Sequence, residues 1–272
     1  MARDAPRHDH MSDRRPSLFH DARVVAGKDL RIEARSKVTT SQVAPFAVLM
    51  LVLFAFALDS LVVRDPSQAD AVTADAKAAI ARAAGAGVLR TSIGDIAASV
   101  VSSGLFWLAV LFAALLAVQR SFAIETADGG REGLRMSSLD PAGIFLGKAA
   151  AIAVQLLVLE VILGIGVVIL YQAELRSPLV LLLTCGLATI GLASVGTAYG
   201  ALAAGLRVRE TLLPLLYFPV VAPMILAAVK ATEAALTGAV GEAWPWVRLL
   251  AVFAVVFSAV GVLTFGTLLE DS

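Results

Sequence analysis

Only one ionisable side chain lies deep inside a long apolar stretch of this chain. Glu160 falls about midway along the apolar residues 149–170. Burying a carboxyl group at that depth in hydrocarbon is costly, so such a residue suggests a function by default. It could bind a proton, contact a transported molecule or form a hydrogen bond in packing. No histidine and no second deep acid accompanies it, so we favour a packing or cavity role over a proton relay.

A second charged group follows the apolar residues 212–229. Lys230 and Glu233 stand three positions apart, a spacing that brings two side chains together on one helical face. The pair either contacts cargo or a partner subunit at an outer turn, or it stabilises the boundary between membrane and water. Trp244 and Trp246 come next and are typical of interfacial anchors.

Motifs for enzymatic chemistry are absent from the sequence. There is no GxxxxGK[ST] loop to hold nucleotide phosphates, and no GxSxG or HExxH motif. The histidines lie in the polar N-terminal segment, and the single cysteine, Cys185, excludes an intrachain disulfide and a CxxC pair. We therefore expect a protein that is not an enzyme and holds no metal or cofactor of its own.

The composition places the chain in the membrane class. Its residues are 58% hydrophobic and 16% charged, whereas an average soluble domain has about 25% charged residues. Apolar stretches that approach or exceed the roughly 20 residues of a membrane span cover residues 44–63, 96–118, 149–170, 179–205, 212–229 and 247–269. Such spans must be helical, because every backbone amide in hydrocarbon needs an internal partner. We predict an all-α polytopic membrane protein with six transmembrane helices and, because the formal net charge is zero, no nucleic-acid partner.

The polar N-terminal region divides into two parts. Residues 1–20 mix charges, Pro and Ser without periodicity and are expected to be a disordered tail. Residues 21–43 are basic and partly amphipathic, which predicts an interfacial elbow helix on the cytoplasmic face of the membrane. The transmembrane domain then covers residues 44–269.

Two features of the apolar stretches concern helix packing. Pro214, Pro219 and Pro223 predict that the fifth span is kinked or broken. Gly196 and Gly200 in the fourth span have the spacing of small residues that let helices approach closely. Such a face suits either a compact bundle or a dimer contact, and the sequence leaves both open.

Two long polar connections join the spans. Residues 64–95 are Ala-rich in part and are expected to contain a helix on the external side. They either cap the outer mouth of the bundle or form an insertion without a role in the mechanism. Lys and Arg are more numerous over the N-terminal segment, residues 119–148 and the turn with Arg207 and Arg209, taken together, than over the other connections. This bias predicts that residues 119–148 and both termini lie on the cytoplasmic side of an inner or plasma membrane.

The connection over residues 119–148 is the candidate coupling site. It is long and contains apolar residues, which argues against a solvated connector. We expect one or two short helices parallel to the membrane within residues 125–140, with Asp128 as a candidate N-cap. Apolar side chains there would insert into a groove on an ATPase, which would push the second and third spans when it closes on ATP.

Three segments resemble the CcmB family, the membrane subunit of the haem-exporting ABC system of cytochrome c maturation. They are KDLRIEARSK (28–37), RSFAIETADGGREGLRMSSLDP (120–141) and the proline-spaced LLPLLYFPVVAPMILAAVKATEAAL (212–236). The resemblance implies an ABC-2-type exporter permease that couples ATP hydrolysis to haem export or to release of a haem-loaded chaperone. The residues expected to carry the coupling are Phe122, Glu125, Asp128, Gly129, Arg131, Leu134, Arg135 and Leu139.

The resemblance also implies partners. ATP would be bound by a cytoplasmic ABC ATPase subunit resembling CcmA, haem would be a cargo of the complex, and a haem-handling membrane subunit would resemble CcmC. This chain would be present as a homodimer in the lipid bilayer. Two alternatives stay open: an ABC-2 permease for a lipid, polysaccharide or drug, and a scaffold that assembles haem-handling partners without transport.

Overall fold

The computed structural model describes most of the apolar part of the chain. It covers residues 18–36, 44–45, 47–49, 52–53, 89–127, 139–171, 175–204 and 209–270. The described helices are α1 (Leu18–Ser36), α4 (Leu89–Ala127), α6 (Pro141–Tyr171), α7 (Pro178–Ala204), α8 (Arg209–Thr237) and α9 (Val240–Glu270). Within these residues every element is helical, as the sequence predicts.

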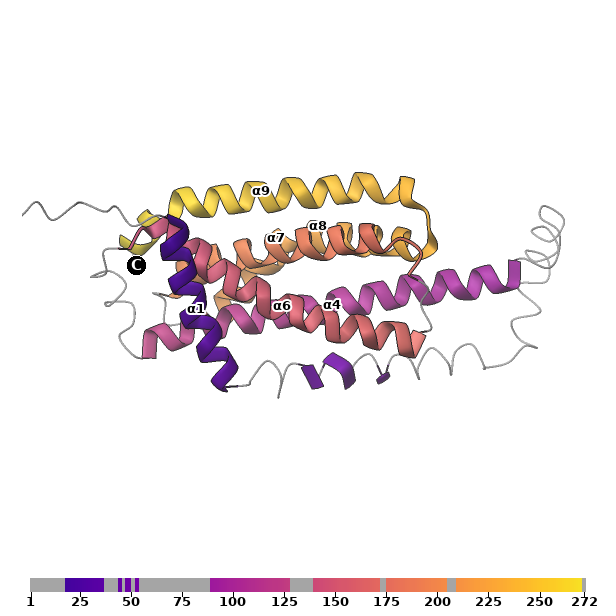
Figure 1. Ribbon diagram of the computed structural model, residues 1–272, viewed down its shortest axis with the longest axis horizontal. Helices are drawn as coiled ribbons and strands as arrows, with labels where there is room; N and C mark the ends of the chain where they lie inside the picture. Colours follow the sequence, from indigo (N-terminus) through magenta and orange to yellow (C-terminus); the bar gives the residue numbers. More distant parts are fainter. Residues whose placement is uncertain are drawn as a thin grey trace, which may run out of the picture.

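Five helices form a lengthwise bundle, and the sixth crosses it. Helices α4, α6, α7, α8 and α9 run along the long axis of the molecule, whereas α1 lies across that axis near the end that carries the C-terminus (Figure 1). Each of the five is long and apolar enough to cross a membrane. The predicted first span, residues 44–63, lies mostly outside the described residues, so five of the six predicted spans correspond to helices of membrane-crossing length and the other stays a prediction.

The helices continue beyond the predicted ends of the spans. Helix α4 extends to Ala127 and α6 begins at Pro141, so both ends of the predicted connection 119–148 are helical. Only residues 128–140 join the two helices, and residues 128–138 lie outside the described part. The sequence prediction placed the ends at the loss of hydrophobicity, but a helix needs only continuous backbone bonding and continues into polar surroundings.

Helix α8 is continuous despite its three prolines, so the predicted break is wrong, whereas the predicted kink stays a prediction. It runs continuously from Arg209 to Thr237 with Pro214, Pro219 and Pro223 inside. In a membrane bundle, neighbouring helices and local backbone adjustments tolerate the lost amide bonds. Lys230 and Glu233 therefore lie within the last turns of α8 rather than beyond its end.

The small residues of α7 make contacts inside this chain. A Cβ atom at Gly196 would meet Val118 of α4, and one at Gly200 would meet the ring of Phe122. Val118 and Phe122 stand four residues apart, so a row of small residues on α7 receives a row of larger ones from α4. Of the two interpretations left open by the sequence, the structure supports the compact bundle at this face.

Polar side chains also join the spans. The indole Nε1 of Trp107 in α4 donates a hydrogen bond to Thr232 Oγ1 in α8 at 2.9 Å. The hydroxyl of Tyr217 donates to the carbonyl of Leu192 at 3.2 Å. These buried groups would be costly in hydrocarbon without partners, so the bonds fix which helices are neighbours.

Candidate functional site: the charged end of the bundle

Helix α1 packs closely against the beginning of α6. Two glycines four residues apart, Gly143 and Gly147, face it. A Cβ atom at Gly147 would lie 2.6 Å from the carbonyl oxygen of Ala22 and 2.7 Å from Cβ of Val25. A Cβ atom at Gly143 would lie 2.8 Å from Cβ of Asp21. Both positions therefore require glycine for the backbones to approach this closely.

The first residues of α6 are held by two carboxylates. Asp140 caps its own helix, because its Oδ1 accepts a hydrogen bond from the backbone amide of Ala142 at 2.9 Å. Asp21 of α1 is fully buried, and its Oδ2 accepts from the backbone amide of Asp140 at 3.1 Å. Two negative charges thus lie at the positive end of the α6 dipole, where they stabilise the helix.

Lys148 is a buried cation at the centre of this end. Its side chain is 1% exposed, and its Nζ lies 3.5 Å from Oδ2 of Asp29 in α1. The same nitrogen donates to Oγ of Ser121 in α4 at 3.2 Å and lies 4.7 Å from the centroid of the Phe122 ring. A carboxylate, a hydroxyl and an aromatic face together offset the cost of removing the ammonium group from water.

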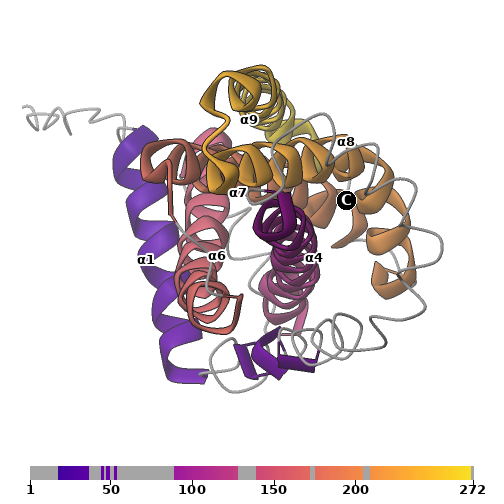
Figure 2. The ribbon, with the colours of Figure 1, turned by 90° about the vertical axis from the view of Figure 1, so that its right-hand side faces the viewer.

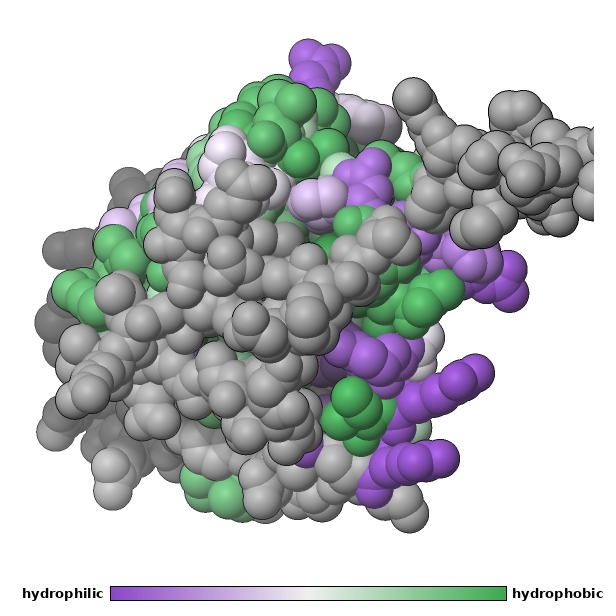
Figure 3. Space-filling model, turned by 90° about the vertical axis from the view of Figure 1, so that its left-hand side faces the viewer, coloured by the Kyte–Doolittle hydropathy of each residue, from purple (hydrophilic) through white to green (hydrophobic). Residues whose placement is uncertain are grey.

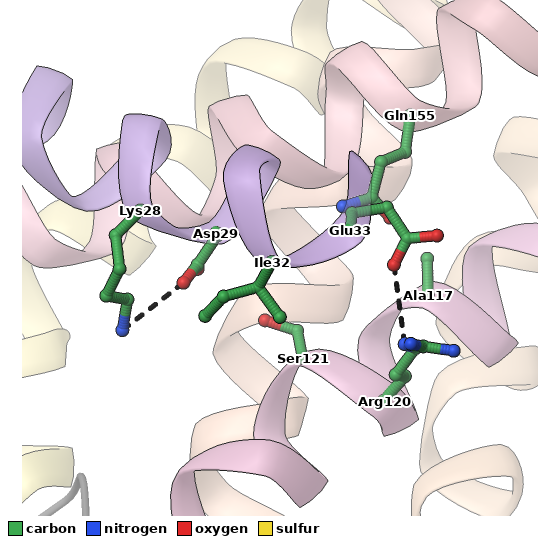
Figure 4. A pocket seen from close by; sticks show the side chains of 8 residues that line it. All are labelled: Lys28, Asp29, Ile32, Glu33, Ala117, Arg120, Ser121 and Gln155. Atoms are coloured by element: carbon green, nitrogen blue, oxygen red, sulfur yellow. Dashed lines mark ion pairs between the residues drawn. The ribbon is translucent and has the colours of Figure 1, made fainter. Parts of the chain in front are cut away.

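A second ion pair connects α1 to α4. Nε of Arg120 lies 3.3 Å from Oε2 of Glu33, although this N–H has no aligned hydrogen-bond partner among the described residues. The pair is therefore held by charge. Figure 4 shows both residues at the edge of a small polar pocket between α1 and α4, with Asp29 paired to Lys28 across a 3.3 Å gap.

The acids of α1 fasten both ends of the connection between α4 and α6. Glu33 holds α4 through Arg120, and Asp21 holds the first turn of α6. Asp29 holds Lys148, which in turn contacts Ser121 of α4. A force applied to the connecting residues 128–138 would therefore reach α4, α6 and α1 together.

The residues predicted to carry coupling divide into two groups. Phe122 is buried between Lys148 and Gly200, so in this structure it packs within the bundle and offers no surface to a partner. Leu139 is half-buried and packs against the core. Glu125 lies in the last turn of α4. The others, Asp128, Gly129, Arg131, Leu134 and Arg135, lie outside the described residues.

Sequence reasoning missed the residues that organise this end. Asp21, Asp29 and Glu33 were treated only as part of a mixed helix, and Gly143 was not singled out. A signal was present for each. Gly143 and Gly147 have the spacing of a close helix contact, and acids at positions 21, 29 and 33 recur on one side of a helix. Helix α1 also begins at Leu18, three residues before the predicted elbow.

Glu160 lies at the base of an apolar groove between α4, α6, α7 and α8. Its side chain is 4% exposed, and Oγ1 of Thr189 donates a hydrogen bond to Oε1. The other oxygen, Oε2, is buried and has no hydrogen-bond partner among the described residues. The groove encloses about 460 Å³. Val161 and Ile165 on its rim are more than half exposed, so it opens sideways toward the surrounding bilayer.

The predicted contact between Lys230 and Glu233 is confirmed. Nζ of Lys230 lies 2.9 Å from Oε2 of Glu233, and both side chains reach solvent or headgroups at the far end of the bundle. Trp244 and Trp246 lie in the first turns of α9, and Trp244 is exposed. This pair lies far along α8 from the charged end and takes no part in its contacts.

A comparison with models of protein families gives a match. The family model described as CcmB protein matches residues 92–271. The matched part begins in α4 and includes α6, α7, α8 and α9, but not α1. No curated protein matches the chain.

Proposed function

The chain belongs to the CcmB family, and from this premise we propose that it transmits force from a separate ATPase into the bundle through the connection between α4 and α6. Members of this family are membrane permease subunits of a haem-exporting ABC system that serves cytochrome c biogenesis. The chain is accordingly a multi-pass transmembrane transport protein and has no catalytic role of its own. The coupling, the partners and the cargo are what the proposal adds.

The observation that carries the proposal is the attachment of α1 to both sides of the connection. An ATPase that grips residues 128–138 can move α4 and α6 only if those helices respond together. Glu33 and Arg120 on one side, and Asp21 and Lys148 on the other, supply that link. The charged end would then act as one rigid lever with two positions, which is what energetic coupling between sites requires.

The family assignment supplies the proposed partners, and this arrangement is compatible with them. The charged end would face the cytoplasm of a cell with an inner or plasma membrane, where an ATPase resembling CcmA binds ATP. Two copies of the chain would contact two ATPase subunits. When the two ATPase subunits close on ATP, each would move the connection between α4 and α6 of one copy. A haem-handling subunit resembling CcmC would lie beside them in the membrane, and the predicted first span would complete six with both termini inside.

Haem export and release of a haem-loaded chaperone both stay compatible with the bundle. The family assignment favours haem over the lipid, polysaccharide or drug cargoes of other ABC-2 permeases. The groove beside Glu160 is the candidate cavity for cargo, because it opens toward the bilayer and ends at a half-satisfied carboxyl group. If the chain were only a scaffold that assembles haem-handling partners, the shape of this groove would not need to change during ATP hydrolysis.

The test removes the contacts that the ATPase is proposed to make with residues 128–138. Leu134→Asp combined with Asp128→Ala should abolish co-purification of the ATPase, because a charge would replace the inserted apolar side chain and the helix cap would be lost. The measurement is a pull-down from membranes with tagged permease. Ser137→Asp adds one negative charge to the same connection, as Leu134→Asp does, but removes no apolar side chain, and it should leave the pull-down intact. Undiminished ATPase recovery by the double variant would contradict the proposal.

A further inference from the structure

Helix α1 separates its charges onto two faces. The acids point inward: Asp21 is fully buried, and the side chains of Asp29 and Glu33 are 12% and 13% exposed. The arginines point outward, where Arg23, Arg31 and Arg35 are exposed. Lys28 is also exposed, and its ammonium group reaches back to Asp29. A helix of mixed composition thus presents an outer surface whose charged side chains are basic.

The outer surface is a shallow depression with several donors. The depression encloses about 660 Å³ and is lined by His20, Arg23, Val24, Gly27, Lys28, Arg31, Ile32 and Arg35. Arg23, Arg31 and Arg35 form no ion pair with any residue in the described ranges. Each guanidinium presents planar donors that match the oxygens of a phosphate group.

The position of α1 sets what can reach this surface. It lies across the bundle near the end that carries the C-terminus (Figure 1), where its acids pair with Arg120 of α4 and Lys148 of α6. Viewed along the bundle, α1 lies on the flank of α6, so its outer face points sideways (Figure 2). Hydrophilic side chains project from that flank in Figure 3.

Apolar side chains stand beside the bases. Phe19 is 81% exposed and Val24 is 50% exposed on the same outer side of α1. A cationic surface with apolar residues at its edge, lying in the membrane plane at the end of the hydrocarbon, is the pattern of a helix that contacts lipid headgroups. A surface for a cytosolic protein or nucleic acid would point along the bundle axis instead.

We propose that the outer face of α1 is a binding site for the phosphate headgroups of anionic phospholipids. Arg23, Arg31 and Arg35 would hold the headgroups, while Phe19 and Val24 insert among the acyl chains. Juxtamembrane clusters of Lys and Arg bind anionic lipids in this way. Because the inner face of α1 fastens α4 and α6, bound lipid would brace the charged end from outside. The inference depends on the position of α1 and needs no ATPase contact.

The experiment measures lipid binding to the purified full chain. Native mass spectrometry in neutral detergent counts bound phosphatidylglycerol and phosphatidylcholine with identical acyl chains, supplied in equal amounts. We expect preferential retention of phosphatidylglycerol. Arg23→Gln combined with Arg31→Gln and Arg35→Gln should weaken that binding at least about tenfold, whereas the three Arg→Lys substitutions should largely retain it.

Controls separate this site from general charge effects. Arg176→Gln with Lys230→Gln and Arg248→Gln removes the same charge at the far end of the bundle and should leave phosphatidylglycerol binding unchanged. Equal loss in both triple variants would overturn the proposal, as would equal retention of the two lipids. Competition by inorganic phosphate at the lipid's own concentration would also overturn it, in favour of a small-anion site. An intact ATPase pull-down in the α1 variant keeps this result separate from the coupling proposal.

Discussion

Two buried ionisable groups on helix α6 differ in the number of polar partners that surround them. Lys148 and Glu160 stand twelve residues apart in α6 by sequence number, and both are at most 4% exposed. Lys148 has a carboxylate, a hydroxyl and an aromatic ring around its ammonium group. Glu160 accepts a hydrogen bond from Thr189 and has the thiol of Cys185 beside it, while one carboxylate oxygen has no hydrogen-bond partner among the described residues.

The difference separates a structural charge from a candidate site. A fully partnered charge fixes geometry, because any movement would break several contacts at once. A half-partnered carboxyl group beside a groove retains capacity to bind a donor that arrives from the membrane. The first should therefore determine stability when altered, and the second should determine function.

The largest effect is expected from Asp29→Asn. The substitution removes the carboxylate that lies 3.5 Å from the buried ammonium group of Lys148, at a cost of about 3 kcal/mol in the free energy of unfolding. Thermal unfolding in detergent measures it. Adding Lys148→Met should restore part of the loss. Glu33→Gln is the matched control: its partner Arg120 is 26% exposed, so we expect about 1 kcal/mol or less. If Asp29→Asn and Glu33→Gln lowered the free energy of unfolding equally, burial of Lys148 would not make its ion pair more important for stability than the more exposed one.

A smaller loss is expected from Gly147→Ala. The added methyl group would collide with the carbonyl of Ala22 and with Val25, so α1 must shift, at a cost of about 1–3 kcal/mol. Gly164→Ala on the same helix is the control, since nothing lies within 4 Å of its new Cβ atom; it should be neutral or slightly stabilising. If the two substitutions changed the melting temperature equally, the close approach of α1 would be wrong.

The smallest stability change is expected from Glu160→Gln. The amide oxygen can still accept the hydrogen bond from Thr189, so the free energy of unfolding should change by about 1 kcal/mol or less. Cytochrome c assembly in cells should fall nevertheless. The substitution replaces the carboxylate oxygen Oε2 by an NH2 group, which donates hydrogen bonds instead of accepting them. Thr189→Val, which removes the existing bond but keeps the carboxylate, gives the comparison. Full assembly by Glu160→Gln would remove this residue from the mechanism.

Several of these features were available from the sequence. The lengths of the apolar stretches predicted the central residues of each described span. The position of Glu160 in a long apolar stretch predicted that its side chain is buried. The spacing of Lys230 and Glu233 predicted their contact, because neighbours on one helix are fixed by its period. Helix ends were predicted poorly, since α6 begins at Pro141, eight residues before the predicted start of the third span at Ala149.

The pairing of distant charges was not available. Asp29 and Lys148 are 119 residues apart, and nothing in the period of either helix says that they meet. Lys148 would by sequence be a solvated end of a loop; only the passage of α1 across α6 buries it. The glycines at 143 and 147 hinted at a close contact without naming the partner helix.

The amino-acid sequence by itself determined that the chain is a set of membrane-length helices with one acid at depth, because hydrocarbon thickness and backbone bonding allow no other form. The tertiary structure alone decided which face of α1 points inward. With that face inward, Asp21, Asp29 and Glu33 contact α4 and α6, and the arginines lie on the outer face. The physical reason is that a buried charge is stable only beside its partner, and partners from separate helices are selected by packing in three dimensions.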